Sequence, residues 1–248
     1  MRLLRGRARD AGTTMTELVV TMVILSIVVI ATTTLTIGFE RTTAENVKRQ
    51  DQIDAGRVAV ERMTRNLRVA VKPSQLSASC AGCVADAFVS GNRFGVQFYA
   101  NLDNANGAVG PSRVTYTVGT VDGVQGVLLE KLQVPDSATP TTSGWNYCDA
   151  EAPTATAACK ARLTVRRLAT GIITTGTALF SYYDENGAPL PVTGTGLTAD
   201  DLQRVLSIEL TVEVGSPGAI RPASTTYVQR VLLSNSHALL RPDPGATP

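Results

Sequence analysis

The sequence contains few of the residues on which most enzyme chemistry depends. Its 248 residues include a single histidine, His237, together with one tryptophan and four cysteines, and aromatic residues make up only 5% of the chain. With one histidine near the C-terminus, neither a Ser–His or Cys–His pair nor a histidine-rich metal site has the groups it needs. We therefore predict no catalytic residues and no enzymatic activity, and we assign no metal and no cofactor.

An excess of charge of one sign is also missing beyond the first twelve residues. Residues 1–12 hold four arginines and one aspartate, and the remainder of the chain has 19 basic and 20 acidic side chains. General nucleic-acid binding requires a concentrated basic surface. We expect no such binding from a nearly neutral chain, while a local basic patch stays open as an alternative.

The N-terminal part contains one long apolar run. Residues 18–37 include no charged residue and no proline over 20 positions, and Arg2, Arg5, Arg7 and Arg9 precede them. As an α-helix rising about 1.5 Å per residue, the run extends roughly 30 Å, which matches the hydrocarbon core of a bilayer. The basic flank predicts a cytoplasmic N-terminus, with the bulk of the protein on the other side. A secretory signal peptide has a shorter apolar core, of about 7–15 residues, and ends in a small-x-small site, so we expect this helix to be retained.

Glu17 is a carboxylate at the edge of this apolar run. An ionised side chain inside a bilayer costs about 2.5–3.5 kcal/mol. Glu17 therefore either marks the membrane boundary or awaits a positive partner. Cleavage after Gly12 would create an α-amino group on Thr13, which the Glu17 of a neighbouring copy could neutralise, because buried charges are tolerated when they are paired.

This N-terminus resembles the class III signal of type IV prepilins and type II secretion pseudopilins. The resemblance rests on the short basic leader, Gly12, the Thr-x-Thr-Glu spacing that ends at Glu17, and the uninterrupted apolar helix. It implies cleavage after Gly12 by a prepilin peptidase, N-methylation of Thr13, and assembly into a helical fibre with Glu17 setting the register. Two positions depart from the family: Thr13 stands where Phe is usual, and Thr34 stands where many major pilins carry a helix-kinking proline.

Other segments resemble J-type minor pseudopilins and PilW-like minor pilins. These segments are VERMTRNLRVA at residues 60–70, LFSYYDENG at 179–187, VLSIELTVEV at 205–214 and VQRVLLSN at 228–235. Short strands and an Asn-Gly turn are common, so these motifs are less specific than the N-terminal signal. The resemblance implies a minor subunit and leaves the pilus, secretion and competence machineries open.

The helical pattern continues past Gly38. Residues 39–72 contain no proline, and Val60, Met63, Leu67 and Val71 recur at steps of three and four residues. We predict that this stripe docks on the protein's own sheet, with a partner-binding surface as the alternative. Pro73 would end the helix, because the residue before a proline is disfavoured in the helical conformation.

From residue 74 the apolar periodicity changes to two, which is typical of half-buried strands. We predict an antiparallel β domain of about seven strands. The candidate strands cover residues 94–98, 114–118, 127–132, 163–168, 178–183, 205–214 and 227–233.

All four cysteines follow the apolar run, on the side of the membrane where disulfides persist. Among the three possible connectivities we favour local pairing, Cys80 with Cys83 and Cys148 with Cys159. The second bond would close a loop of about twelve residues and contribute about 3 kcal/mol. A zinc site and a redox-active Cys80–Cys83 pair are alternatives, which the spacing and the surrounding sequence favour less.

Three further segments, two acidic and one aromatic, remain to be interpreted. The segment 184–187 could hold Ca²⁺, but its Asp-Glu-Asn-Gly sequence fits a hairpin turn better. Asp200 and Asp201 precede Leu202 and are expected to open a short helical turn. Trp145 and Tyr147 lie in a polar loop, where we predict buried packing, with a surface adhesive contact as the alternative.

Together these features predict an α+β protein in which a long N-terminal α-helix, half transmembrane and half amphipathic, packs on an antiparallel β-sheet head, as in the pilin-like fold. The expected organisation is a basic leader (1–12), a transmembrane or fibre-core helix (13–38), its amphipathic continuation (39–72), an extracytoplasmic β-rich head (73–240) and a disordered tail (241–248).

The expected role is structural, as a minor pilin or pseudopilin. The subunit would cross the cytoplasmic membrane once, with its head outside the cytoplasm, and then enter a pilus or pseudopilus at the cell surface. The expected partners are the prepilin peptidase, other pilin or pseudopilin subunits, assembly platform proteins and the membrane. The alternatives are a binding module on an uncleaved signal anchor and a secreted enzyme.

Overall fold

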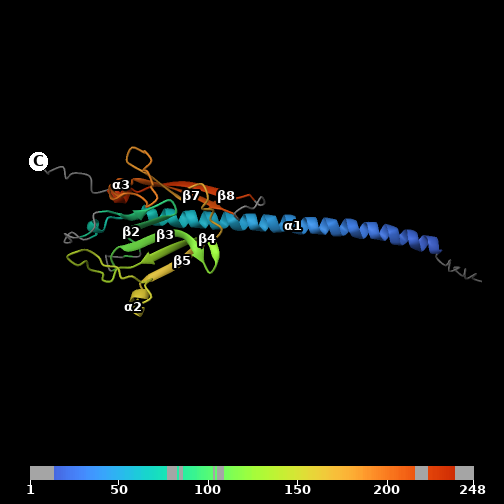
Figure 1. The fold of residues 1–248 in the computed structure, drawn as a ribbon, viewed down its shortest axis with the longest axis horizontal. Helices are drawn as coiled ribbons and strands as arrows, with labels where there is room; N and C mark the ends of the chain where they lie inside the picture. Colours follow the sequence, from blue (N-terminus) through green and yellow to red (C-terminus); the bar gives the residue numbers. More distant parts are fainter. Residues whose placement is uncertain are drawn as a thin grey trace, which may run out of the picture. The chain divides into compact units, whose positions relative to one another are not determined.

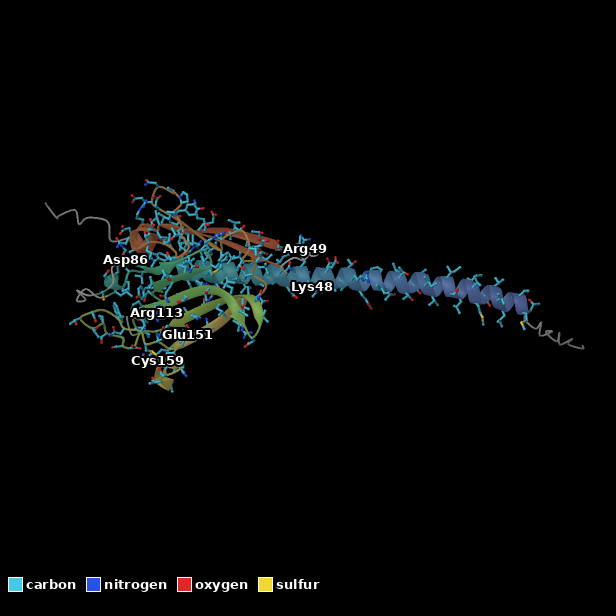
Figure 2. The ribbon with its side chains drawn as sticks, viewed as in Figure 1. Lys48, Arg49, Asp86, Arg113, Glu151 and Cys159 are labelled. Atoms are coloured by element: carbon cyan, nitrogen blue, oxygen red, sulfur yellow. A yellow bond between two sulfur atoms is a disulfide. The ribbon has the colours of Figure 1, made fainter. Side chains whose placement is uncertain are left out.

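The computed structural model describes residues 14–76, 83, 86–102, 104, 109–215 and 223–237. The chain forms two compact units, Met1–Lys48 and Arg49–Pro248, and the long helix α1 (Met15–Arg68) contributes to both. Lys48 and Arg49, labelled in Figure 2, are the residues at which the first unit ends and the second begins.

In the first unit, every described residue from Met15 onward is helical. The predicted apolar helix is therefore present. Helices in water-soluble proteins gain most of their stability by packing an apolar face on the rest of the protein, but all described residues of this unit are exposed within the chain. In an apolar solvent the same segment keeps its backbone hydrogen bonds internally, so the helix is suited to an environment that the chain itself does not supply.

Two antiparallel sheets make up most of the second unit, and with α1 they give the predicted α+β class. Five strands pair in chain order in one sheet, and three strands pair in chain order in the other. The five-stranded sheet contains β1 (Phe88–Gly91), β2 (Gly95–Ala100), β3 (Ser112–Val121), β4 (Val124–Gln133) and β5 (Leu163–Ala169), and the three-stranded sheet contains β6 (Phe180–Tyr183), β7 (Ser207–Val214) and β8 (Thr225–Leu232).

The C-terminal part of α1, residues 49–68, lies between the two sheets (Figure 1). On one side Asn66 hydrogen-bonds to Tyr116 of β3 and Glu130 of β4. On the other side Gly56 is so close to β8 that an added Cβ would lie 2.5 Å from the ring of Tyr227. The helix therefore forms the middle layer of the head, and both sheets bury apolar side chains against it.

The predicted helical stripe is confirmed as this buried face. Met63 and Leu67 are completely buried, and Val60 and Val71 retain 9% and 8% exposure. Val60, Met63 and Leu67 join one core with aromatic residues of both sheets, among them Phe98 and Phe180. Docking on the protein's own sheets, rather than on a partner, is thus the correct interpretation of the stripe.

Hydrogen bonds from β6 and the residue before it connect the two sheets at the turn between β1 and β2. The backbone N–H groups of Leu179 and Phe180 donate to the carbonyl of Arg93 at 2.9 and 3.1 Å. The phenol of Tyr182 donates to the carbonyls of Asn92 and Gly95 at 3.0 and 3.2 Å. These contacts fix the edge of one sheet against the start of the other.

Four short helical segments complete the described fold: η1 (Pro73–Gln75), α2 (Ala157–Lys160), α3 (Ala199–Arg204) and α4 (Ser234–His237). The helical turn predicted at Asp200 and Asp201 is present as α3. Its N-cap is Thr198, whose hydroxyl accepts a hydrogen bond from the backbone N–H of Asp201. The single histidine, His237, ends α4.

Two details of the predicted fold are wrong, and one strand was not predicted. The helix ends at Arg68 rather than at residue 72, because Ala70 bridges to Ala100 and the Val71 N–H donates to the carbonyl of Tyr99, so this backbone pairs with the end of β2. The described residues form eight strands rather than about seven, since β1 was not predicted. The strands are also divided between two sheets, which alternation along a strand does not reveal.

Candidate functional site

The described N-terminal helix begins with a local hydrogen-bonded cap. Thr14 precedes the first helical residue, and its hydroxyl accepts a hydrogen bond from the backbone N–H of Glu17 at 3.3 Å. Thr14 and Glu17 have the spacing of a capping box, and a carboxylate in the first turn interacts favourably with the positive end of the helix dipole. Glu17 therefore stabilises its own helix whether or not it meets a partner. The predicted cleavage and methylation residues, Gly12 and Thr13, lie outside the described residues.

After Glu17 the helix presents apolar side chains on all sides. The large hydrophobic residues from Leu18 to Ile37 are each between 44% and 66% exposed, so no face of this segment is covered by the chain. Figure 2 shows these side chains projecting outward around the helix. A continuous apolar surface of this size is typical of an interaction surface or a membrane segment rather than of a surface in water.

The hydroxyl groups in this segment are satisfied within the helix. Side chains of threonine and serine donate to carbonyl oxygens three or four residues earlier, at distances between 2.7 and 3.0 Å. The donors are Thr21, Ser26, Thr32, Thr33, Thr34 and Thr36. Because these bonds replace water as the partner, the polar side chains do not oppose transfer of the segment into an apolar medium.

By length and composition, α1 is the one helix among the described residues that is suited to crossing a membrane. Its apolar part lies near the N-terminus and is not buried in the protein. The location agrees with the predicted transmembrane segment.

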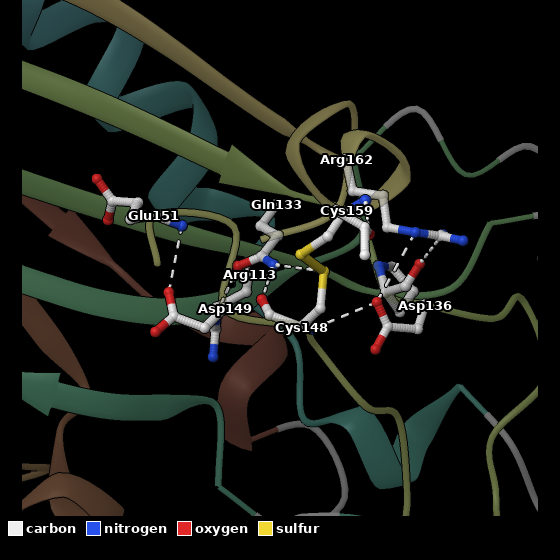
Figure 3. The surroundings of a disulfide bond; sticks show 10 residues. Arg113, Gln133, Asp136, Cys148, Asp149, Glu151, Cys159 and Arg162 are labelled. Atoms are coloured by element: carbon white, nitrogen blue, oxygen red, sulfur yellow. Dashed lines mark hydrogen bonds and ion pairs between the residues drawn. A yellow bond between two sulfur atoms is a disulfide. The ribbon is translucent and has the colours of Figure 1, made fainter. Parts of the chain in front are cut away.

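The second predicted site is the disulfide between Cys148 and Cys159, the local pairing that the sequence favours. Their Cα atoms are 6.0 Å apart, and Figure 3 shows the polar side chains around the bond. The Gln133 amide donates to the Cys148 carbonyl at 2.5 Å, and the Asp136 carboxylate accepts a hydrogen bond from the Cys148 N–H at 3.2 Å. Both backbone groups of Cys148 are thus held, and the loop from residue 134 to residue 162 is fixed on the outer face of the five-stranded sheet.

The other cysteine pair falls mostly outside the described residues. Cys83 is disulfide-bonded, and Cys80, its predicted partner, is not among the residues that the structure describes.

The segment 184–187 forms the predicted turn. One carboxylate oxygen of Asp184 accepts hydrogen bonds from the backbone N–H groups of Asn186 and Ala188, and the other pairs with Arg204 at 3.0 Å. These donors, the Ala188 N–H foremost, hold the pKa of Asp184 below its ordinary value. The carboxylate is committed to the turn, which explains why a Ca²⁺ site is the weaker interpretation.

Trp145 and Tyr147 are used in packing, as predicted. The Trp145 indole lies against Gly110 and donates to the Ala138 carbonyl at 3.3 Å. The Tyr147 phenol donates to the Pro111 carbonyl at 2.6 Å, and burial raises its pKa above the ordinary value. Both residues are half-buried, so packing covers part of each ring and leaves part of it at the surface.

Sequence reasoning missed a buried polar cluster around Glu130. This carboxylate is fully buried, and it accepts hydrogen bonds from Arg62, Asn66 and Tyr116 at 2.8 to 3.3 Å. One signal was available: Glu130 occupies the position two residues after the buried Leu128, on the inward side of an alternating strand. The cluster joins α1 to the five-stranded sheet. Its members hydrogen-bond to one another, so we assign it a structural role.

No three His, Cys, Asp or Glu side chains of the described residues gather as metal ligands would. No family model, no curated protein and no solved structure matches the chain.

Proposed function

We propose that this chain is a minor pilin or pseudopilin, a structural subunit of a type IV pilus or a type II secretion pseudopilus. The observation that carries the proposal is the N-terminal helix, on which a single carboxylate, Glu17, precedes 20 residues without charge. The basic leader, Gly12 and the Thr-x-Thr-Glu spacing support it, as does an α+β head built around the continuation of the same helix. The subunit would act in initiation of the fibre or in assembly of its tip or shaft.

The helix stores the subunit in the cytoplasmic membrane before assembly. Its backbone and its hydroxyl groups are hydrogen-bonded internally, so between residues 18 and 37 each hydroxyl donor already has a partner when it faces lipid. The arginine-rich leader keeps the N-terminus on the cytoplasmic side, and the disulfide-bonded head lies outside.

Assembly then replaces lipid with the helices of neighbouring subunits. A shallow hollow on one side of the helix is lined by small and apolar residues, among them Ala31, Gly38 and Phe39, and such surfaces allow two helices to approach closely. Glu17 sets the register by neutralising the α-amino group of a neighbouring subunit's Thr13 after cleavage. The partners of this mechanism are the prepilin peptidase, the assembly platform proteins and other pilin or pseudopilin subunits.

The test is the intact mass and N-terminal sequence of the protein purified from membranes of its native host. The proposal predicts a mature chain that starts at methylated Thr13, and a Gly12→Val variant should accumulate with its leader attached. A wild-type chain that still begins near Met1 would contradict the proposal and favour a binding module on an uncleaved signal anchor. A chain that begins after Gly38 would identify a secreted protein.

A further inference from the structure

A polar cleft lies on the outer face of the five-stranded sheet, away from α1. Its volume is about 60 Å³, and its floor consists of side chains from β2, β3 and β4. Asp149, Ala150 and Glu151 of the disulfide-closed loop line it as well, and the Asp149 carboxylate accepts a hydrogen bond from the Glu151 N–H at 3.2 Å. Cys148 next to them is anchored by Gln133. A cleft of this size holds about two water molecules or one small polar group.

Strand register explains how the floor is assembled. Thr115 is the cross-strand partner of Gln97 on β2 and of Lys131 on β4, and Arg113 is the partner of Gln133. Because residues two apart on a strand point to the same face, these side chains form two adjacent polar rows. The floor therefore brings two cations, Arg113 and Lys131, to one small area.

Among the described residues, only one of these two cations, Lys131, has a carboxylate partner. Lys131 pairs with Glu151 of the loop at 2.6 Å. Arg113 donates to the neutral amide of Gln133 at 2.5 Å and stands 4.9 Å from the centre of the Tyr147 ring. Among the ion pairs of the described residues, none includes Arg113.

We infer that this cleft binds a carboxylate group, with Arg113 as the principal contact and Thr115 and Lys131 as further donors. A guanidinium group is the side chain best suited to carboxylate, because its planar N–H groups match the two oxygens. The contact between Lys131 and Glu151 shows that the floor already accepts one carboxylate. Both oxygens of Glu151 accept from Lys131, at 2.6 and 2.8 Å, and its side chain is 58% exposed, so it competes with the incoming group and can be displaced into solvent.

The inference does not depend on the proposed function, and it is tested on the full-length protein in detergent. Thermal unfolding of the head is followed by the fluorescence of Trp145, the only tryptophan, in sodium acetate and in sodium chloride at equal concentration. With acetate well above its Kd, the wild-type Tm should exceed the chloride value by about 2–4 °C. Arg113→Gln should abolish this difference, and Glu151→Gln should enlarge it by removing the competitor.

Arg65→Gln is the matched control, because it removes an exposed positive charge of the same head and should keep the wild-type response. An equal acetate response in wild type and Arg113→Gln would overturn the inference, and so would an unchanged response in Glu151→Gln. If Arg113→Gln does not fold, Thr115→Val should reduce the response in its place, and a full response there would also count against the site.

The source of the carboxylate is identified in the same titration. A short glutamate peptide that binds more tightly than acetate would indicate an acidic segment of a partner protein. Equal affinity per carboxylate group would indicate a small organic acid.

Discussion

Tyr116 of β3 and Glu130 of β4 are direct partners in the sheet, and the phenol of Tyr116 donates a 2.8 Å hydrogen bond to the buried carboxylate of Glu130. The Asn66 amide of α1 donates to both groups, at 2.8 and 2.9 Å. Arg62, one helical turn earlier, donates from two of its nitrogens to the same carboxylate. A buried charge is thus placed at the junction of helix and sheet and is satisfied from both sides.

Removal of Arg62 should destabilise the head strongly. Among the described residues, Arg62→Ala leaves the buried Glu130 with Arg166, at 3.6 Å, as its one cationic partner, so we expect a loss of about 2–3 kcal/mol in the free energy of unfolding. The measurement is the denaturant midpoint of the full-length protein in detergent. Arg65→Ala, on the exposed side of the same helix, should change stability by less than about 0.5 kcal/mol. Equal midpoints for the two variants would show that the cluster does not stabilise the junction.

Gly56 should not tolerate even a methyl group. An added Cβ would lie 2.5 and 2.6 Å from two ring carbons of Tyr227 and 3.3 Å from Val214. The Tyr227 phenol is also held by a hydrogen bond to the Ile53 carbonyl, so the ring has little freedom to retreat. We expect Gly56→Ala to lower the free energy of unfolding by about 1–3 kcal/mol, as overpacking does in other cores.

Gly119→Ala provides the control for this substitution. An added Cβ at Gly119 meets nothing within 4 Å, and the residue has no positive φ. Its unfolding midpoint should stay close to that of the wild type. A Gly56→Ala protein as stable as Gly119→Ala would mean that the helix and β8 are separated more widely than described.

The Cys148–Cys159 bond should contribute to the stability of the head. It closes a short loop, with a sequence separation of 11, and chain entropy gives about 3 kcal/mol for a loop of this order. Cys148→Ser with Cys159→Ser should therefore lower the Tm under oxidising conditions. Trp145 fluorescence should also report an altered environment, because the loop that carries it loses its anchor. A double variant that unfolds at the wild-type temperature would contradict this prediction.

Stability of the head should fall in alkaline solution. Burial raises the pKa of Tyr116, Tyr147 and Tyr182 well above the ordinary value of 10.0, and the adjacent Glu130 raises that of Tyr116 further. Above pH 10 the unfolded chain releases these protons while the folded chain keeps them. The unfolded state then binds fewer protons, so the free energy of unfolding decreases as the pH rises, by up to about 1.4 kcal/mol per pH unit for each tyrosine.

Denaturant midpoints between pH 9 and pH 12, read together with tyrosinate absorbance, measure this effect. Tyr147→Phe should flatten the dependence by removing one of the three phenols. A midpoint that does not change across this range would show that the three phenols are accessible to hydroxide in the folded protein.

Substitution of Glu17 should separate processing from assembly. We expect Glu17→Ala to be cleaved after Gly12 as in the wild type but to be missing from sheared fibres, because its neighbour's α-amino group would enter the helix bundle without a partner. Glu40→Ala, which removes the next acidic residue along the helix, should be recovered in fibres. Recovery of Glu17→Ala at the wild-type level would remove Glu17 from the proposed mechanism.

Patterns within single elements were predictable from the sequence. The spacing of Val60, Met63 and Leu67 indicates a buried helical face, and alternation along residues 205–214 indicates a half-buried strand, because both periodicities follow from backbone geometry alone. The disulfide between Cys148 and Cys159 was predictable for a different reason, namely that the two cysteines are close in sequence.

Contacts between distant elements were not predictable in this way. Tyr116 and Glu130 meet because of the register of β3 and β4, and Asn66 reaches them from a helix, 50 and 64 residues earlier in the chain. The division into two sheets around α1 likewise depends on which strands pair, and alternation describes only the face that each strand buries. The cleft at Arg113 has the same origin, because its floor exists only once three strands are aligned.

A pulling force on the chain before Arg49 enters the head through residues 49–68 of α1. Along this stretch Ile53 is held by Tyr227 on one sheet, while Arg62 and Asn66 are held by Glu130 on the other. Both sheets contact the same helix. Pulling the helix out of the head therefore requires these contacts and the apolar core around Met63 to break together. The head should therefore carry tension as a single mechanical element and yield abruptly at high load, instead of unravelling strand by strand.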